Sequence, residues 1–145
     1  SNMRTTFVAF AALCALPLIA EAQTPVARRA AASADGAVRI QSMAGSVRVT
    51  GWAHDSIAVT GTVPDPALGQ FVFSVGEGGA KLGVWETGAK PAEAHLEVHV
   101  PARSTIWIKT AGADVRVEGV TGSIDAFSRH GSLLSVGRTF GPRQP

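Results

Sequence analysis

The sequence predicts an all-β protein, and three observations lead to this prediction. From residue 37 onward, apolar residues occupy every second position in short runs, which glycine, proline, aspartate, serine and threonine interrupt. No run of about ten residues or more shows the spacing of an amphipathic helix. A six-residue pattern also recurs with its glycine in register, and with 46% hydrophobic residues the chain can bury a core. We therefore expect short strands joined by tight turns.

The recurring pattern also predicts how these strands are arranged. Residues 46–51 (SVRVTG) recur ten residues later as residues 56–61 (SIAVTG), and a second series at residues 114–117, 123–126 and 132–135 steps by nine. Each copy reads as one strand with an inward apolar pair and a glycine-containing turn. The connections are too short for a helical crossover, which needs about a dozen residues. We predict a parallel β-solenoid, with an antiparallel β-sandwich as the alternative.

The chain begins with the pattern of a secretory signal peptide. Arg4 supplies a positive start, residues 7–20 are apolar, and Ala20 and Ala22 fit the small-residue pattern of a cleavage site. The apolar run is shorter than the roughly 20 residues that a membrane-spanning helix needs. We therefore predict cleavage before Gln23, export to the periplasm or the cell surface, and no membrane span after cleavage.

Four segments follow from these patterns: a non-native remnant plus signal peptide (1–22), a flexible leader (23–35), a β-repeat domain (36–136) and an irregular tail (137–145). The only cysteine, Cys14, lies in the signal segment. The rest of the chain has no thiol, which excludes disulfides, cysteine catalysis and cysteine–metal sites.

The region between the two repeat series departs from the nine-to-ten-residue period. Residues 71–75 and 81–85 flank a glycine-rich stretch at 76–80, which predicts a hairpin. Residues 96–101 (LEVHVP) and 105–110 (TIWIKT) alternate as two further strands, and proline closes the first of them. The side chains that we expect to face inward there are Leu96, Val98, Val100, Ile106 and Ile108.

The segment from residue 96 onward resembles a known family. The pattern LEVHVP, the alternating strand at 105–109 and TAGADVRVEGVTGSI at 110–124 are similar to exported bacterial domains of unknown function that are labelled "putative adhesins". Such domains have a signal peptide and a Gly-x-Val-x-Val strand, which residues 45–49 match, and they form right-handed β-solenoids. The resemblance covers residues 36–134 and implies a right-handed solenoid without catalytic residues. The chain departs from the family at 137–145, where further strand units are usual.

One strand is a candidate metal site. His95, Glu97 and His99 alternate with apolar residues, so their side chains are expected on one outward face. Residues two apart on a strand stand roughly 7 Å apart, and two imidazoles can converge on one metal ion from that distance. Further ligands would have to come from a neighbouring strand. The competing interpretation is an ordinary solvated strand face.

Two tryptophans are candidate ligand-binding residues. Trp85 and Trp107 fall on the opposite parity from the inward residues of their strands, and exposed large aromatic side chains can mark a sugar-binding or protein-binding face. A loop or tail that covers them is the alternative. Trp52, at an expected turn, is interpreted as a packing residue.

The sequence predicts no catalytic residues and no cofactor. It contains neither the Gly-x-Ser-x-Gly elbow of esterases nor a His-Glu-x-x-His helix. Arginines at 28, 29, 138 and 143 lie near the ends of the chain, and between residues 33 and 135 acidic residues outnumber basic ones, which argues against nucleic-acid binding.

We therefore expect a non-catalytic, adhesin-like binding or scaffolding module of the cell envelope. Its expected contacts are an envelope protein or glycan, and a second copy bound through uncapped strand edges. The alternative is a carbohydrate-active or metal-dependent hydrolase on the same scaffold.

Overall fold

The computed structural model describes residues 22–85, 90–129 and 134–137. In these residues the chain forms eleven strands and one 3₁₀ helix. They are β1 (Gln23–Ala31), β2 (Ala37–Gln41), β3 (Ala44–Trp52), β4 (Ser56–Pro64), η1 (Asp65–Gln70), β5 (Phe71–Gly76), β6 (Gly79–Val84), β7 (Glu93–Pro101), β8 (Thr105–Thr110), β9 (Asp114–Glu118), β10 (Ile124–Ser128) and β11 (Leu134–Gly137). The all-β prediction is confirmed.

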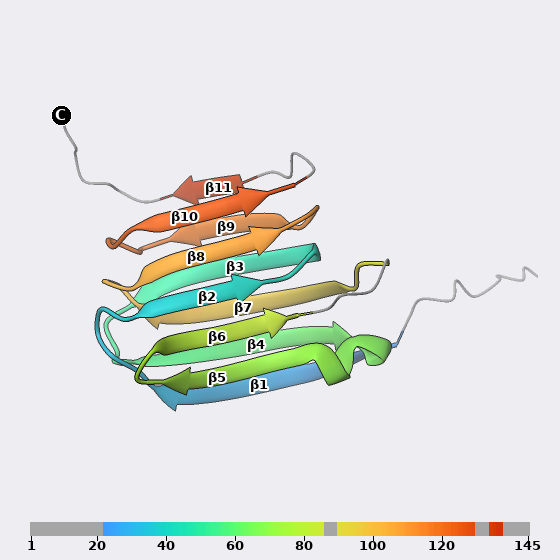
Figure 1. The fold of residues 1–145 in the computed structure, drawn as a ribbon, viewed down its shortest axis with the longest axis horizontal. Helices are drawn as coiled ribbons and strands as arrows, with labels where there is room; N and C mark the ends of the chain where they lie inside the picture. The colour runs from blue at the N-terminus through green and yellow to red at the C-terminus, as the bar shows by residue number, and fades with distance from the viewer. Residues whose placement is uncertain (1–21, 86–89, 130–133, 138–145) are drawn as a thin grey trace, which may run out of the picture.

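The strands form two sheets that pack face to face (Figure 1). Sheet A has the order β1-β4-β7-β3-β9-β11, and sheet B has the order β10-β8-β2-β6-β5. In Figure 1, β1 and β5 lie at one end of the stack and β10 and β11 at the other. The chain repeatedly leaves sheet B and enters sheet A, as it does from β2 to β3 and from β8 to β9.

The core lies between the two sheets and consists of aliphatic side chains on alternate strand positions. On β7, Leu96, Val98 and Val100 are at most 1% exposed, and on β8, Ile106 and Ile108 are fully buried, which confirms the inward sets predicted from the alternation. Burying each such side chain contributes about 1.5–3 kcal/mol. The residues between them on the same two strands point outward, so most polar side chains of β7 and β8 lie on the outer faces of the sheets.

Both sheets are mixed, so the predicted parallel solenoid of stacked equivalent units is wrong. Among the described strands, β1 with β4, β4 with β7, and β5 with β6 pair antiparallel, and the remaining pairs are parallel. The arrangement is sandwich-like and fits the alternative in its two layers, although most of its pairs are parallel. Parallel pairing arises where the chain crosses to the other sheet between two strands of one sheet, as it does between β8 and β10 and between β9 and β11.

The first sequence repeat does not form two equivalent stacked units. Residues 46–51 lie in β3 and residues 56–61 lie in β4, on opposite sides of β7 in the same sheet. The chain reverses direction between β3 and β4, so β3 pairs parallel with β7 and β4 pairs antiparallel with it. In the second series, β11 pairs parallel with β9, while β10 lies in the other sheet. The same sequence pattern therefore occurs in strands that pair parallel and in a strand that pairs antiparallel with its neighbours.

Residues 23–31, which we expected in a flexible leader, form the edge strand β1. Its nine residues pair with β4 from Gln23 opposite Pro64 to Ala31 opposite Ser56, and Val26 is buried. An edge strand buries few side chains, so this one lacks the alternation of apolar residues from which the other strands were predicted.

Other expectations are confirmed where the structure describes them. The hairpin is formed by β5 and β6, which pair antiparallel with Gly76 opposite Gly79.

Residues 138–145, most of the expected tail, and residues 1–21, most of the signal segment, lie outside the described residues. Within the described residues, no helix has the length and apolar character needed to cross a membrane.

Two glycines allow the neighbours of β7 to approach it closely. Gly45 on β3 and Gly61 on β4 have φ angles of 91° and 146°, a region that favours glycine. A Cβ atom at Gly45 would collide with the carbonyl oxygen of Ala94, and one at Gly61 with that of His95. The central strand of sheet A is therefore enclosed by backbone contacts that only glycine permits.

Candidate binding surface on sheet A

The outer face of sheet A is organised around β7, which carries His95, Glu97 and His99. The register places Glu97 between Arg48 of β3 and Thr60 of β4. The next strand, β9, places Arg116 beside Arg48. Because alternate residues of a strand share one face, these polar side chains form continuous rows across the sheet. The face therefore mixes positive, negative and neutral polar groups.

A shallow depression lies in this face over β9, β3, β7 and β4. It has a volume of about 760 Å³, and its polar lining includes Ser46, Arg48, Thr60, His95, Glu97 and Arg116. Sites for small ligands usually have volumes of about 300–1,000 Å³. The depression is open to solvent, which suits one segment of a larger partner better than an enclosed substrate.

Two polar residues of the depression, His95 and Arg116, take part in weak side-chain contacts. Ser46 Oγ and His95 Nδ1 are hydrogen-bonded at 2.9 Å, and Arg116 Nε donates to Glu118 Oε2 at 2.8 Å. The side chains of Arg116 and Glu118 are 53% and 40% exposed, so their ion pair contributes about 1 kcal/mol at most. A ligand can therefore replace the water and these weak contacts with little loss of free energy.

The Ser46–His95 pair does not form a nucleophile triad. The register runs Asp114, Ser46 and His95 across three neighbouring strands, so the carboxylate lies on the far side of the serine. A triad needs the carboxylate behind the imidazole, where it orients the ring. The arrangement therefore supplies a polar contact surface and gives no support to a hydrolytic mechanism.

The structure places His95, Glu97 and His99 on one face of β7, as the alternation predicts. Within the described residues, however, no group of three or more histidine, cysteine, aspartate or glutamate side chains is arranged to hold a metal ion. His95 is hydrogen-bonded to Ser46, and the ring of His99 stacks on Trp52. Metal binding at these residues stays a prediction that the geometry does not favour.

Trp52, interpreted as a packing residue, is the centre of a cluster of aromatic rings and one guanidinium on the same face. Its ring centroid lies 4.7 Å from that of His99 and 4.9 Å from that of His54. The Arg29 guanidinium carbon lies 5.0 Å from the centre of the Trp52 ring. These side chains come from β1, β3, β7 and the turn after β3, and we call them the Trp52 cluster.

Of the two tryptophans singled out from the sequence, Trp107 lies in sheet B and Trp85 follows a strand of sheet B. Trp107 is half-buried on the outer face of β8, between Arg39 of β2 and Asp125 of β10. Trp85 follows β6, and its Nε1 donates to the carbonyl oxygen of Leu82 at 3.1 Å. The Lys81 ammonium lies 4.4 Å from the centre of the Trp85 ring and covers part of it. Ligand binding by Trp85 and Trp107 stays a prediction.

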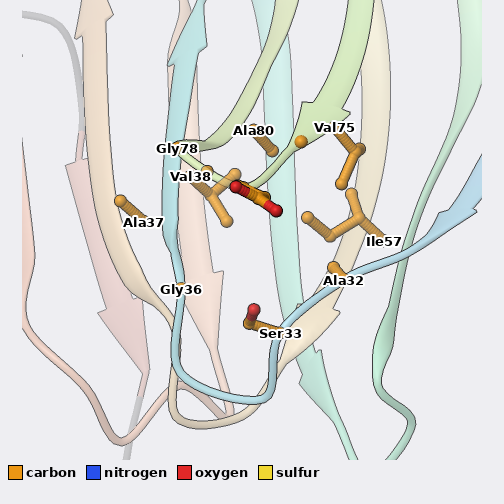
Figure 2. A pocket seen from close by; sticks show the side chains of 12 residues that line it. Ala32, Ser33, Gly36, Ala37, Val38, Ile57, Val75, Gly78 and Ala80 are labelled. Atoms are coloured by element: carbon orange, nitrogen blue, oxygen red, sulfur yellow. The ribbon is translucent and has the colours of Figure 1, made fainter.

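A second hollow lies at one end of the space between the sheets. Figure 2 shows Val38, Ile57 and Val75 around it, with Gly36, Ser33 and Ala32 nearby. Its volume is about 80 Å³, well below that of ordinary small-molecule sites. We interpret it as incomplete packing beneath the β5–β6 turn.

Sequence reasoning missed the depression and the Trp52 cluster. Ser46 and His95 are separated by 49 positions, and their contact depends on the insertion of β7 between β3 and β4. Arg29 reaches the cluster only because β1 joins the sheet. The serine and histidine in alternating patterns were the available signal, but nothing local indicated which strands are neighbours.

Comparisons with known proteins support the fold. No family model matches the chain, and no curated protein matches it. A crystal structure described as a putative adhesin from Bacteroides fragilis is similar, with a TM-score of 0.52, 11% sequence identity, and coverage of 79% of this chain and 53% of that chain.

Two other structures are similar at TM-scores below 0.5 and add no argument. One is described as a putative cell adhesion protein from Clostridium sporogenes, with a TM-score of 0.49, 5% identity, and coverage of 72% of this chain and 59% of that chain. The other is described as a putative lipid binding protein from Parabacteroides distasonis, with a TM-score of 0.46, 12% identity, and coverage of 70% and 46%. The chain thus spans about half the length of the structures that it resembles.

Proposed function

We propose that this protein is an exported, non-catalytic module of the cell envelope that binds an envelope partner through the outer face of sheet A. The observation on which the proposal depends is the open polar depression over β9, β3, β7 and β4. It offers both signs of charge and hydroxyl groups on a rigid sheet, so it can pair with the polar and charged groups of a partner.

The remaining features fit this proposal. The interior between the sheets is packed with apolar side chains, and its hollow of about 80 Å³ is small for a ligand, so we place recognition on the outer faces. The first strand begins at Gln23, the residue that follows the expected cleavage point. The Bacteroides fragilis structure with the similar fold is described as a putative adhesin, and we infer a relationship to such domains together with a place in the periplasm or at the cell surface.

Two exposed threonines provide the test. Thr60 lines the depression, while Thr105 lies on β8 in sheet B. Tyrosine is well tolerated in strands, so Thr60→Tyr fills the depression without opposing the strand, and Thr105→Tyr is the matched control. The full chain would be expressed in cells, and export would be read from fractionation. Protein purified from the exported fraction would then be co-sedimented with isolated envelopes.

We expect the protein in the exported fraction, and we expect Thr60→Tyr to bind envelopes at least about tenfold more weakly than Thr105→Tyr, a difference of about 1.4 kcal/mol. Retention of the full chain in the cytoplasm would contradict the proposed location. Equal envelope binding by the two variants, with both proteins folded, would contradict the proposed binding face.

A further inference from the structure

The Trp52 cluster occupies the end of the outer face of sheet A, next to the depression. Trp52 lies at the end of β3, and the register places it opposite Pro101, two residues beyond His99 on β7. The Arg29 guanidinium and the imidazole rings of His54 and His99 gather around its indole ring. Such a combination of aromatic rings and a cationic group is a means of binding ligands as well as of packing.

Hydrogen bonds fix the centre of the cluster in place. The indole Nε1 of Trp52 donates to the carbonyl oxygen of Ser56 at 2.8 Å, and the carbonyl oxygen of Trp52 accepts from the backbone N–H of Ala102 at 2.9 Å. Arg29 Nη2 donates to Ser56 Oγ at 3.2 Å. A ligand that meets these groups finds them already ordered, so it loses less free energy to ordering the site.

The Arg29 guanidinium has capacity for an anion. Guanidinium has five N–H donors, and the contacts identified for Arg29 are one hydrogen bond to a neutral hydroxyl and the indole ring. The only ion pair found within residues 22–85, 90–129 and 134–137 joins Arg116 to Glu118, so no carboxylate of these residues neutralises Arg29. Two acidic residues lie near the cluster. Asp55 is in the same turn as His54, and Glu118 on β9 is separated from His99 on β7 by Thr50 of β3.

The surroundings favour a sugar acid over a membrane surface. A lipid surface is bound by exposed apolar side chains or by dense positive charge. The exposed large apolar side chains of the described residues, Leu68 and Phe127, lie on η1 and β10, away from the Trp52 cluster. Asp55 and Glu118 lie near the cluster, so its surroundings do not have the dense positive charge that an anionic membrane attracts. Partly exposed rings beside one guanidinium match instead a pyranose with apolar C–H groups and one carboxylate.

We propose that Arg29, Trp52, His54 and His99 bind an acidic sugar of an envelope glycan, with the sugar carboxylate on the Arg29 guanidinium and the sugar ring beside the aromatic side chains. The inference rests on the proposed function, because the cluster adjoins the depression on the same face. It adds the chemical class of the ligand and the residues that recognise its charge.

The test compares the charged and neutral forms of one probe. Protein purified from the exported fraction of cells that express the full chain would be titrated with trigalacturonate, with neutral galactotriose, with inorganic phosphate and with vesicles that contain phosphatidylglycerol. The variants are Arg29→Gln, which removes the charge, Arg29→Lys, which keeps it, and Arg39→Gln on the outer face of sheet B as the matched control. Thermal unfolding would be measured for each variant.

We expect trigalacturonate to bind the unaltered protein and galactotriose to bind much more weakly or not at all. Arg29→Gln is expected to weaken trigalacturonate binding about tenfold or more, while Arg29→Lys keeps part of the affinity and Arg39→Gln keeps all of it. Absence of trigalacturonate binding, equal binding of the neutral sugar, or equal loss in the two glutamine variants would overturn the proposal. Binding of phosphate or anionic vesicles in preference to trigalacturonate would overturn the sugar assignment.

These results are independent of the test of the proposed function. If Thr60→Tyr loses envelope binding but Arg29→Gln binds trigalacturonate normally, the binding face stands and the acidic-sugar site fails. If both threonine variants bind envelopes equally, the proposed function itself fails, whatever the Arg29 variants do.

Discussion

Sheet A and sheet B present similar inner faces but different outer faces. Both inner faces carry fully buried aliphatic side chains, such as Leu96 in sheet A and Ile108 in sheet B. On the outside, sheet A has the polar depression and the Trp52 cluster, whereas sheet B has Trp107 between Arg39 and Asp125. Both sheets therefore contribute to stability, while the features suited to recognition lie on the outer face of sheet A.

The first prediction concerns the equivalence of the inner faces. Leu96→Ala in sheet A and Ile108→Ala in sheet B each remove a side chain that is at most 1% exposed. Each is expected to lower the free energy of unfolding by about 2–5 kcal/mol, from lost burial and the cavity that remains. Urea denaturation would measure both. A cost below about 1 kcal/mol for either variant would show that the two sheets do not share one core.

The second prediction concerns the close packing around β7 in sheet A. Gly61→Ala is expected to lower the free energy of unfolding by about 2 kcal/mol or more, because the new Cβ atom meets the His95 carbonyl oxygen at a φ of 146°. Gly69→Ala is the matched control, since nothing lies within 4 Å of a Cβ atom at that position. Equal thermal stability of the two variants would contradict the account of how β7 is enclosed.

The third prediction concerns the ends of the sheets. Among the described strands, β10 ends sheet B and β11 ends sheet A, and Phe127 on β10 is 56% exposed. Unpaired strand edges invite another strand, so we expect a homodimer through this end, weakened by Phe127→Asp. Light scattering over a concentration series would measure the mass. A monomer at all concentrations would contradict the prediction.

The smallest effect is expected from the surface ion pair of sheet A. Glu118→Gln removes the partner of Arg116, and both side chains are exposed to solvent. The free energy of unfolding should change by about 0.5 kcal/mol or less, and less still at high salt. A loss above about 1 kcal/mol in thermal or urea denaturation would show that the pair supports the sheet more than its exposure allows.

The sequence predicted the parts of the fold that depend on neighbouring residues. Alternation alone identified the strands that became β7 and β8, with the correct inward residues, and the glycine-rich stretch between β5 and β6 indicated their hairpin. Alternation reports which face a side chain occupies, and it does so without knowledge of the partner strand.

The strand order could not be predicted, and neither could the depression and the Trp52 cluster, which depend on it. The repeats at 46–51 and 56–61 look equivalent, yet β7 separates them and one of the two strands is antiparallel to it. Arg29 was expected in a flexible leader, so its contact with Trp52 had no basis in the sequence. Contacts between residues distant along the chain follow from strand order, which periodicity does not encode.

The most direct test of a binding face on sheet A is backbone amide chemical-shift mapping during titration with a soluble fragment of envelope glycan. We predict that the largest changes fall on β3, β4, β7 and β9, around Thr60, Glu97 and Trp52, while β2, β6 and β8 change little. Changes centred on Trp107 and Arg39 of sheet B, with sheet A unaffected, would contradict the account.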